Sequence, residues 1–156
     1  MTDGEFIELY NAQAAALLRY CALRLDSHHE AEDVTAEVFA RALVKLDRVA
    51  ANDRVRWLFV VARNLCADAQ RQARRRSQVR VAASDGADGS PWIDERVSRA
   101  VRSLPRSQQE VVFLRVLEDR SFAEAARILG RPESYVRVLY HRALKRLRTI
   151  AKEVGT

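Results

Sequence analysis

The amino-acid sequence predicts an all-α protein made of two small helical domains joined by a flexible linker. Apolar residues recur at helical spacing along the chain, and no convincing period-two run indicates a strand. Capping signals precede several of these segments. Between residues 77 and 91 the chain turns small and polar, with two glycines, a composition typical of a flexible tether. We therefore expect a first domain over 3–76 and a second over 92–152.

Three helices are expected in the first domain, because three stretches of apolar periodicity each follow a capping signal. The first runs from Phe6 to Leu25, the second from Ala31 to Leu46, and the third starts near Val55 and ends in an arginine run. The capping residues expected to begin them are Thr2 with Glu5, Ser27 with Glu30, and either Asn52 or Asp53.

The second domain is expected to end in a helix-turn-helix over 121–148. A helix restarting at Trp92 is broken at Leu104-Pro105, and 108–116 forms another before a turn. Ser121 with Glu124 then resembles a capping box, Gly130 suits a left-handed cap, and Pro132 suits the next helix start. A short helix, a tight turn and a longer basic helix are typical of DNA-binding helix-turn-helix motifs. The alternative is an ordinary helical hairpin with a solvated basic face.

The charge is uneven along the chain, which carries 27 basic and 21 acidic residues. Residues 54–76 hold seven arginines against the single acid Asp68, and residues from 121 onward hold eight bases against three acids. Residues 26–37, by contrast, hold five acids and no Lys or Arg. Two separate basic regions indicate a polyanion that is contacted at two places.

The cysteines and the hydropathy predict a protein of the cytoplasm. Cys21 and Cys66 each fall on the apolar side of a helical pattern, so we expect two buried free thiols in a reducing compartment. No apolar run approaches membrane-spanning length, and we expect no membrane insertion. We also expect no sensory domain beyond Thr156.

Enzyme chemistry is not expected from this sequence. His28-His29 invites a metal-site interpretation, but no Cys or His partner stands at ligand spacing, so exposed helix-start histidines are favoured. No glycine-rich phosphate loop and no nucleophile constellation is present in the sequence. We expect no metal and no cofactor.

A series of short motifs runs through both expected domains. The segments are 31–35 (AEDVT), 38–43 (VFARAL), 57–58, 62–64, 104–105, 121–126 (SFAEAA), 129–130, 136–137 and 142–143. Each motif is weak alone, but their order and spacing over nearly the whole chain are specific. In this order they resemble the motifs of the extracytoplasmic-function (group IV) sigma factors of bacterial RNA polymerase.

The resemblance implies a two-domain initiation factor that recruits RNA polymerase core to promoters and helps to melt them. It implies a region 2-like first domain that recognises and melts the minus-ten element, and a region 4-like second domain that reads the minus-thirty-five element. The implied partners are the β′ clamp helices and β flap of the core, and promoter DNA. The family resemblance leaves open whether an anti-sigma factor is a further partner.

The resemblance also implies that the second helix docks on the β′ clamp helices. The expected contact residues are Glu32, Asp33, Glu37, Phe39 and Arg41. Charge complementarity would orient the contact, and Phe39 or a neighbouring apolar residue would anchor it. Alternatively, the acidic residues only stabilise the start of the helix by interacting with its dipole, without a docking role.

The third helix and the loop before it are expected to bind the minus-ten element. In the family, this loop captures a base flipped out of the non-template strand, and Asn52 and Asp53 are its polar groups here. The arginines neutralise phosphates. The expected residues are Asn52, Asp53, Arg54, Arg56, Arg63, Asn64, Arg71, Arg74 and Arg75. For Trp57 we favour packing in the core over a role as a stacking platform for a base. Asn64 either lies on the solvated helix surface or contacts DNA.

The second helix of the helix-turn-helix is expected to read the minus-thirty-five element. Arg137 is the strongest base-reading candidate, because a guanidinium can pair bidentately with guanine. The expected residues are Arg131, Ser134, Tyr135, Arg137, Val138, His141 and Arg142. Tyr135 stands where the family usually has a small Thr, and Val138 and Leu139 either contact thymine methyls or simply pack. The minus-thirty-five specificity is therefore open.

Two other function classes fit parts of the sequence. A DNA-binding regulator that acts without polymerase would share the basic helices but would not need the acidic second helix. A regulatory scaffold that binds only proteins would leave the basic helices as solvated surface. Binding to core polymerase would distinguish a sigma factor from a regulator that acts without polymerase. Salt-sensitive DNA binding would exclude the scaffold that binds only proteins.

Overall fold

The computed structural model describes residues 1–79 and 94–154, and every regular element within them is a helix. The chain divides into two compact units, Met1–Ile93 and Asp94–Thr156, called here the N-terminal and C-terminal units. The predicted all-α fold class is confirmed for the described residues. The linker was expected from residue 77, whereas helix α3 continues to Val79; the remainder of the expected linker lies outside the described residues.

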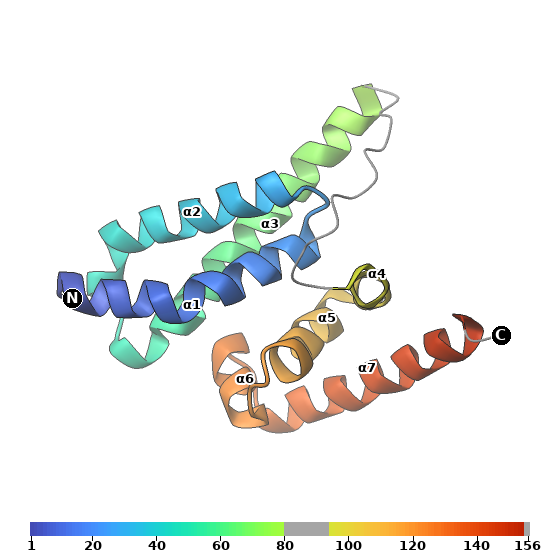
Figure 1. The fold of residues 1–156 in the computed structure, drawn as a ribbon. Coiled ribbons are helices and arrows are strands. Elements are labelled where there is room, and N and C mark those ends of the chain that lie inside the picture. The colour runs from blue at the N-terminus through green and yellow to red at the C-terminus, as the bar shows by residue number, and fades with distance from the viewer. Residues whose placement is uncertain (80–93, 155–156) are drawn as a thin grey trace. The chain divides into compact units, whose positions relative to one another are not determined.

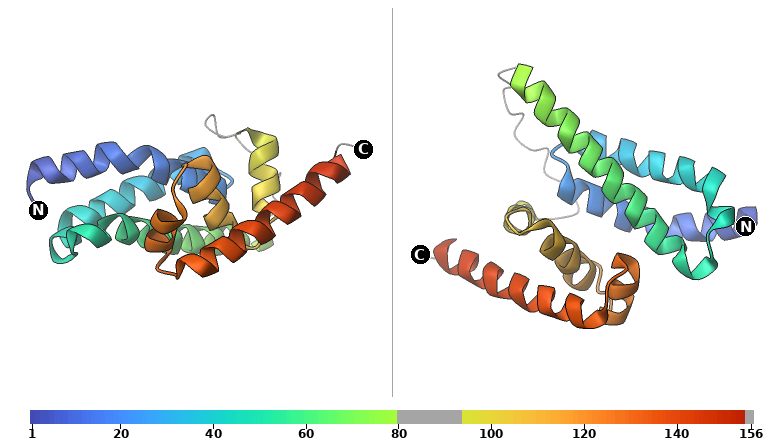
Figure 2. Two further views of the ribbon diagram at one scale, coloured as in Figure 1. Left: turned by 90° about the horizontal axis from the view of Figure 1, so that it is seen from below. Right: turned by 180° about the vertical axis from the view of Figure 1, so that it is seen from behind.

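Three long helices make up the N-terminal unit. Helices α1 (Asp3–Arg24) and α2 (His28–Lys45) run antiparallel, and α3 (Arg54–Val79) returns along both of them. Two short 3-10 turns, η1 (Leu46–Arg48) and η2 (Ala51–Asp53), connect α2 to α3. The C-terminal end of α3, green in Figures 1 and 2, extends beyond the other two helices. The arginine run therefore lies on a projecting helix end.

Local capping begins the first two helices as expected. The Thr2 hydroxyl accepts from the Glu5 amide at 3.1 Å, and the Glu5 carboxylate accepts from the Thr2 amide at 3.4 Å, which completes the capping box. The Ser27 hydroxyl accepts from the Glu30 amide at 3.2 Å. Asn52 lies within η2, so a 3-10 turn leads directly into α3.

The core of the N-terminal unit fills the space between the three helices. Tyr20 of α1 meets Phe59 of α3 edge to face, with ring centroids 5.8 Å apart. Phe39 of α2 lies under Phe6 and Tyr10 of α1, at centroid distances of 6.4 and 4.8 Å. The other large or central buried side chains are Leu17, Cys21, Leu23, Val38, Leu46, Leu58, Ala62 and Cys66. Burial of this apolar surface is the main force that joins the helices.

Helices α4 (Glu95–Arg102), α5 (Arg106–Val112), α6 (Phe122–Leu129) and α7 (Glu133–Val154) build the C-terminal unit. Asp94 caps α4, so this helix begins later than the expected start at Trp92, which lies outside the described residues. Helix α5 begins at Arg106, two residues before the expected start. It continues as a π-helical turn, η3 (Phe113–Leu117), before the chain reaches α6.

The turn between α6 and α7 confirms the predicted helix-turn-helix geometry. Gly130 is left-handed, with φ of 66°, a conformation that glycine adopts without steric cost. The Arg131 amide donates to the Ala126 carbonyl at 3.0 Å and the Gly130 amide to the Arg127 carbonyl at 3.3 Å, a Schellman motif. The Ser121 hydroxyl accepts from the Glu124 amide at 3.0 Å at the other end of α6.

Candidate nucleic-acid interface

One side of α3 gathers most of the polar residues expected to bind the minus-ten element. At 3.6 residues per turn, these positions occupy about a third of the helix circumference, away from the buried Leu58 and Ala62. Arg63 is half-buried on this side. The exposed members are Arg56, Asn64, Arg71, Arg74 and Arg75. The arrangement gives a basic strip along α3, interrupted by Val60 and Ala67, and such a strip suits the charges of a phosphate backbone.

Arg54 differs from the other arginines of α3. Its side chain is 20% exposed, and its guanidinium lies 3.6 Å from the Glu5 carboxylate of α1. This contact turns Arg54 toward the protein, so it is poorly placed to neutralise a phosphate and serves to tie α3 to α1. Arg71, which pairs with Asp68 one turn earlier, keeps 62% of its side chain exposed.

The loop residues expected to read a base are exposed in the structure. Asn52 and Asp53 lie in η2, immediately before α3, and Arg56 follows on the first turn of the helix. Trp57 is half-buried, whereas Leu58 and Phe59 beside it are in the core. Its indole therefore packs in part against the protein and stays in part open to solvent.

The turn before α7 and the N-terminal half of α7 present the residues expected to read the minus-thirty-five element. Arg131 lies in the turn, and the others lie on the helix. All of them are exposed: Arg131, Ser134, Tyr135, Arg137, Val138, His141 and Arg142. Val136, Leu139 and Ala143 are buried on the other side of the helix. Of the two apolar residues expected either to contact thymine methyls or to pack, Leu139 is 7% exposed and packs in the core. Val138 is 46% exposed.

Two further basic residues extend this exposed side of α7. Lys145 follows His141 by one helical turn, and Arg148 follows Lys145 at the next. Both are exposed. The sequence carried the signal for them, because positions three, four and seven residues apart share one helical face; the basic surface therefore continues toward the C-terminal end of α7.

Arg137 is held in place by two contacts. Its guanidinium donates to the Glu133 carboxylate at 2.7 Å, four residues earlier on α7. It also lies over the ring of Phe122, at 4.4 Å from the centroid. The side chain keeps 53% exposure despite both contacts. Arg137 is thus both ordered and accessible.

The acidic side of α2 is exposed as expected for a docking surface. Each acid pairs within the helix: Glu32 with His28 at 2.6 Å, Asp33 with His29 at 3.6 Å, and Glu37 with Arg41 at 3.0 Å. Such exposed pairs contribute little to stability, so they leave the acids accessible to a partner.

Phe39 does not fit its expected role as an exposed anchor on α2. It is 5% exposed, because Phe6 and Tyr10 of α1 cover its ring. Leu43 and Val44, further along α2, are 63% and 76% exposed. These two are the large apolar side chains that α2 exposes.

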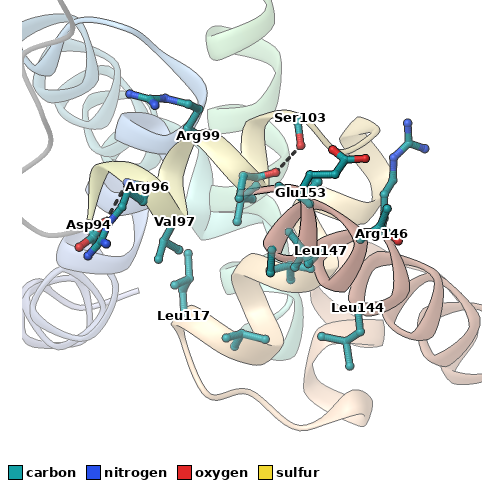
Figure 3. Close-up of a pocket in the computed structure, with 17 residues that line it drawn as sticks. Asp94, Arg96, Val97, Arg99, Ser103, Leu117, Leu144, Arg146, Leu147 and Glu153 are labelled. Atoms are coloured by element: carbon teal, nitrogen blue, oxygen red, sulfur yellow. Dashed lines mark hydrogen bonds and ion pairs between the residues drawn. The ribbon is translucent and has the colours of Figure 1, made fainter. Parts of the chain in front are cut away.

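An apolar groove of about 950 Å³ lies between α4, η3 and α7 of the C-terminal unit. Figure 3 shows Val97 of α4, Leu117 of η3 and Leu147 of α7 on its walls. Val97 and Val116 are 43% and 52% exposed, so the groove is open to solvent.

The two cysteines are free and buried, as expected. The pKa of the Cys21 thiol is lowered, chiefly by a hydrogen bond with the Cys66 side chain. Among residues 1–79 and 94–154, no group of three or more His, Cys, Asp or Glu side chains is placed to hold a metal ion. In the same part of the chain, no helix is both long and apolar enough to cross a membrane.

A helix-turn-helix in one unit and a basic helix face in each unit define a two-unit helical protein of the nucleic-acid-binding class. Comparison with known families gives the particular family. Residues 9–76 match the family model of Sigma-70 region 2, and residues 94–147 match that of Sigma-70, region 4.

Several curated relatives carry the same description. The chain is 34% identical over 154 residues to the ECF RNA polymerase sigma factor BldN of Streptomyces coelicolor, covering 91% of this chain and 58% of BldN. It is 33% identical to the sigma factor ShbA of Streptomyces griseus, covering 87% of this chain and 82% of ShbA. It is 32% identical to SigL of Mycobacterium tuberculosis, covering 94% and 89%.

The chain belongs to the ECF family of RNA polymerase sigma factors, and the resemblance found in the sequence is confirmed. Sigma factors are transcription initiation factors that direct RNA polymerase to promoters. Two solved structures share the fold at 22% sequence identity. They are RpoE from Bartonella quintana in complex with NepR (TM-score 0.70, covering 95% of this chain and 97% of that one) and CnrH in complex with the cytosolic domain of CnrY (TM-score 0.73, covering 97% and 90%).

Proposed function

We propose that this sigma factor divides promoter recognition between its two units. The region 2-like domain, over 3–76, binds core polymerase and opens the minus-ten element. The region 4-like domain, over 92–152, reads the minus-thirty-five element, and residues 77–91 connect the two. The observation that carries this division is that each unit matches a different sigma region and bears its own basic helix face.

The minus-ten role is assigned to η2 and the exposed strip of α3. Asn52 and Asp53 supply the hydrogen-bonding groups that a flipped base requires, since the cost of unstacking has to be offset by specific contacts. The arginines Arg56, Arg71 and Arg74 neutralise phosphates beside it. Arg54 is excluded from this set because its guanidinium faces Glu5.

The minus-thirty-five role is assigned to the exposed side of α7. Arg137 reads a base through bidentate hydrogen bonds, and Val138, being exposed, offers an apolar contact to a thymine methyl. Arg131, His141 and Arg142 contact phosphates or base edges.

The core polymerase is assigned two contact surfaces on this chain. Glu32, Asp33 and Glu37 face the β′ clamp helices, with Leu43 and Val44 as the exposed apolar residues of the same helix. The open groove between α4 and α7 suits an apolar segment of the β flap. An anti-sigma factor is a candidate third partner, since both structures of the same fold are complexes with another protein.

The chain acts in this proposal as an initiation factor in the cytoplasm, where RNA polymerase works, and not as a catalyst of its own. Holoenzyme formation tests the proposal. Labelled full-length protein is titrated with bacterial core polymerase at low salt and the anisotropy is followed. Saturable binding supports the proposal, and absence of any affinity at low salt would rule out the sigma function.

A further inference from the structure

The contact between Arg137 and Phe122 joins the two helices of the helix-turn-helix. Phe122 is the first residue of α6, and Arg137 lies in the second turn of α7. The guanidinium lies 4.4 Å from the ring centroid, within the range of a cation–π interaction. The base-reading candidate is therefore braced by a residue outside its own helix.

The Phe122 ring is itself fixed from two other elements. The guanidinium of Arg115, from η3, lies 4.3 Å from the ring centroid and donates to the Arg120 carbonyl at 2.7 Å. Tyr140 of α7 meets the ring edge to face at 5.2 Å. The ring is half-buried among these groups. Its orientation is thus set by the fold and not by the chain of α6 alone.

A fixed ring at Phe122 limits the conformations that the Arg137 side chain adopts. Arginine has a long side chain with many rotamers, and ordering it on DNA has an entropic cost. Bidentate pairing with a base also requires a defined plane for the guanidinium. The Phe122 ring offers a surface on which this plane can rest, and the Glu133 carboxylate holds the donor end at 2.7 Å.

We propose that Phe122 is a positioning residue for Arg137, and that it thereby determines specificity at one base pair of the minus-thirty-five element. Glu133 is the second positioning residue. The inference rests on the proposed function, because it assumes that Arg137 reads a base. Phe122 itself touches no DNA in this account, so its removal affects preference and not general affinity.

A purely structural role for Phe122 makes a different prediction. If the ring only packs α6 against α7, its loss weakens binding to all sequences alike and does so whether or not Arg137 is present. If the ring positions Arg137, the effect is confined to one base pair and disappears when Arg137 is absent. Two positions that act through one contact are non-additive in a double-mutant cycle.

The experiment uses the full chain assembled with bacterial core polymerase. The probe is a library of DNA duplexes with a randomised upstream element, and the bound fraction is sequenced to give a preference at each base pair. The variants are Arg137→Ala, Phe122→Leu, Phe122→Tyr, Glu133→Gln and the double variant of Phe122→Leu with Arg137→Ala. Circular dichroism and thermal melting confirm that each variant is folded.

Arg137→Ala should abolish the preference at one base pair. Phe122→Leu should lower that same preference about two- to fivefold, the size expected for a partly exposed cation–π contact. Phe122→Tyr, which keeps the ring, should restore it. Phe122→Leu should have no added effect in the Arg137→Ala background, and the salt dependence of binding should not change. Glu133→Gln should lower the same preference while raising affinity for the whole library, because it removes an acid beside the DNA.

The outcomes separate the inference from the proposed function. If Arg137→Ala changes no preference, the assignment of Arg137 as a base reader fails. If Arg137→Ala removes a preference that Phe122→Leu leaves intact, only the positioning role is overturned. An equal loss at every base pair, or a Phe122→Leu effect that persists without Arg137, also overturns it. Should Phe122→Leu not fold, the Glu133→Gln result decides, and an unchanged preference there contradicts the inference.

Discussion

Arg24 at the end of α1 and Gln70 of α3 bind each other through two hydrogen bonds. The Gln70 amide donates to the Arg24 carbonyl at 2.7 Å, and the Arg24 guanidinium donates to the Gln70 amide oxygen at 3.4 Å. Arg24 also donates to the Tyr20 hydroxyl at 2.5 Å and is 6% exposed. This contact lies directly before Arg71, so it fixes the helix that carries the basic strip relative to α1.

Gln70→Ala should therefore destabilise the protein by about 1–3 kcal/mol, because it removes two hydrogen bonds to a buried arginine, one to its carbonyl and one from its guanidinium. Gln72→Ala is the matched control, since Gln72 is exposed two residues further along α3. Urea unfolding of the full chain, followed by circular dichroism, measures both. Equal unfolding midpoints for the two variants would show that the Arg24–Gln70 contact makes no net contribution to stability.

Gly130→Ala should weaken the helix-turn-helix by about 1–2 kcal/mol, because an alanine Cβ clashes in the left-handed conformation that Gly130 adopts at φ of 66°. Gly130→Asn should cost less, as asparagine tolerates this region. The measurement is thermal melting together with binding of the full chain to promoter DNA within the holoenzyme. A variant as stable as the wild type would mean that the turn relaxes without loss.

Asp94 gives a pH-dependent prediction for the start of α4. The Arg96 amide, which donates to its carboxylate at 2.8 Å, and then the Arg96 side chain hold the pKa of Asp94 below its ordinary value of 3.8. A lowered folded-state pKa stabilises the fold above the ordinary value, and this contribution is lost as pH falls through the lowered value. The stability difference between wild type and Asp94→Ala should thus be constant from about pH 7 to about pH 5 and shrink in stronger acid.

Asp94→Asn is the control for this titration, because asparagine keeps a side-chain acceptor for the cap but has no charge to lose. Its stability relative to Asp94→Ala should not change with pH. Thermal melts across the pH range measure all three proteins. A wild-type advantage that grows in acid would contradict the assigned direction of the pKa shift.

Reversing the charge of Glu32, Asp33 and Glu37 to Lys should lower affinity for core polymerase by about tenfold or more, since like charges across an interface are strongly unfavourable. Helix content should stay intact, because all three side chains are exposed. Glu8→Lys, on exposed surface of α1, is the control for a charge reversal placed away from α2. Anisotropy titration with core measures the affinities, and an unchanged value for the triple variant moves the docking surface elsewhere.

The sequence predicted the elements whose causes are local. The capping pairs Thr2–Glu5 and Ser121–Glu124 and the left-handed Gly130 depend on residues a few positions apart, so their patterns can be read directly. The exposed sides of α3 and α7 follow from helical periodicity for the same reason. The resemblance to sigma factors was carried by the order of such motifs.

Features set by distant partners were not predictable from the same patterns. Phe39 looked like an exposed anchor, but Phe6 and Tyr10 of another helix cover it. Arg54 looked like one more phosphate contact, but Glu5 draws it inward. The π turn at 113–117 has no sequence signature of its own: it is defined by the Glu118 amide donating to the Phe113 carbonyl at 2.9 Å.

Transcription by core polymerase reconstituted with this chain tests the central claim most directly. The template is a library of genomic DNA fragments, and transcript starts are mapped by sequencing. The account predicts defined starts preceded by two shared elements at constant spacing, with Arg137→Ala flattening the upstream element and changes at Asn52 and Asp53 flattening the downstream one. Starts scattered as with core alone, or a single variant that erases both elements equally, would contradict it.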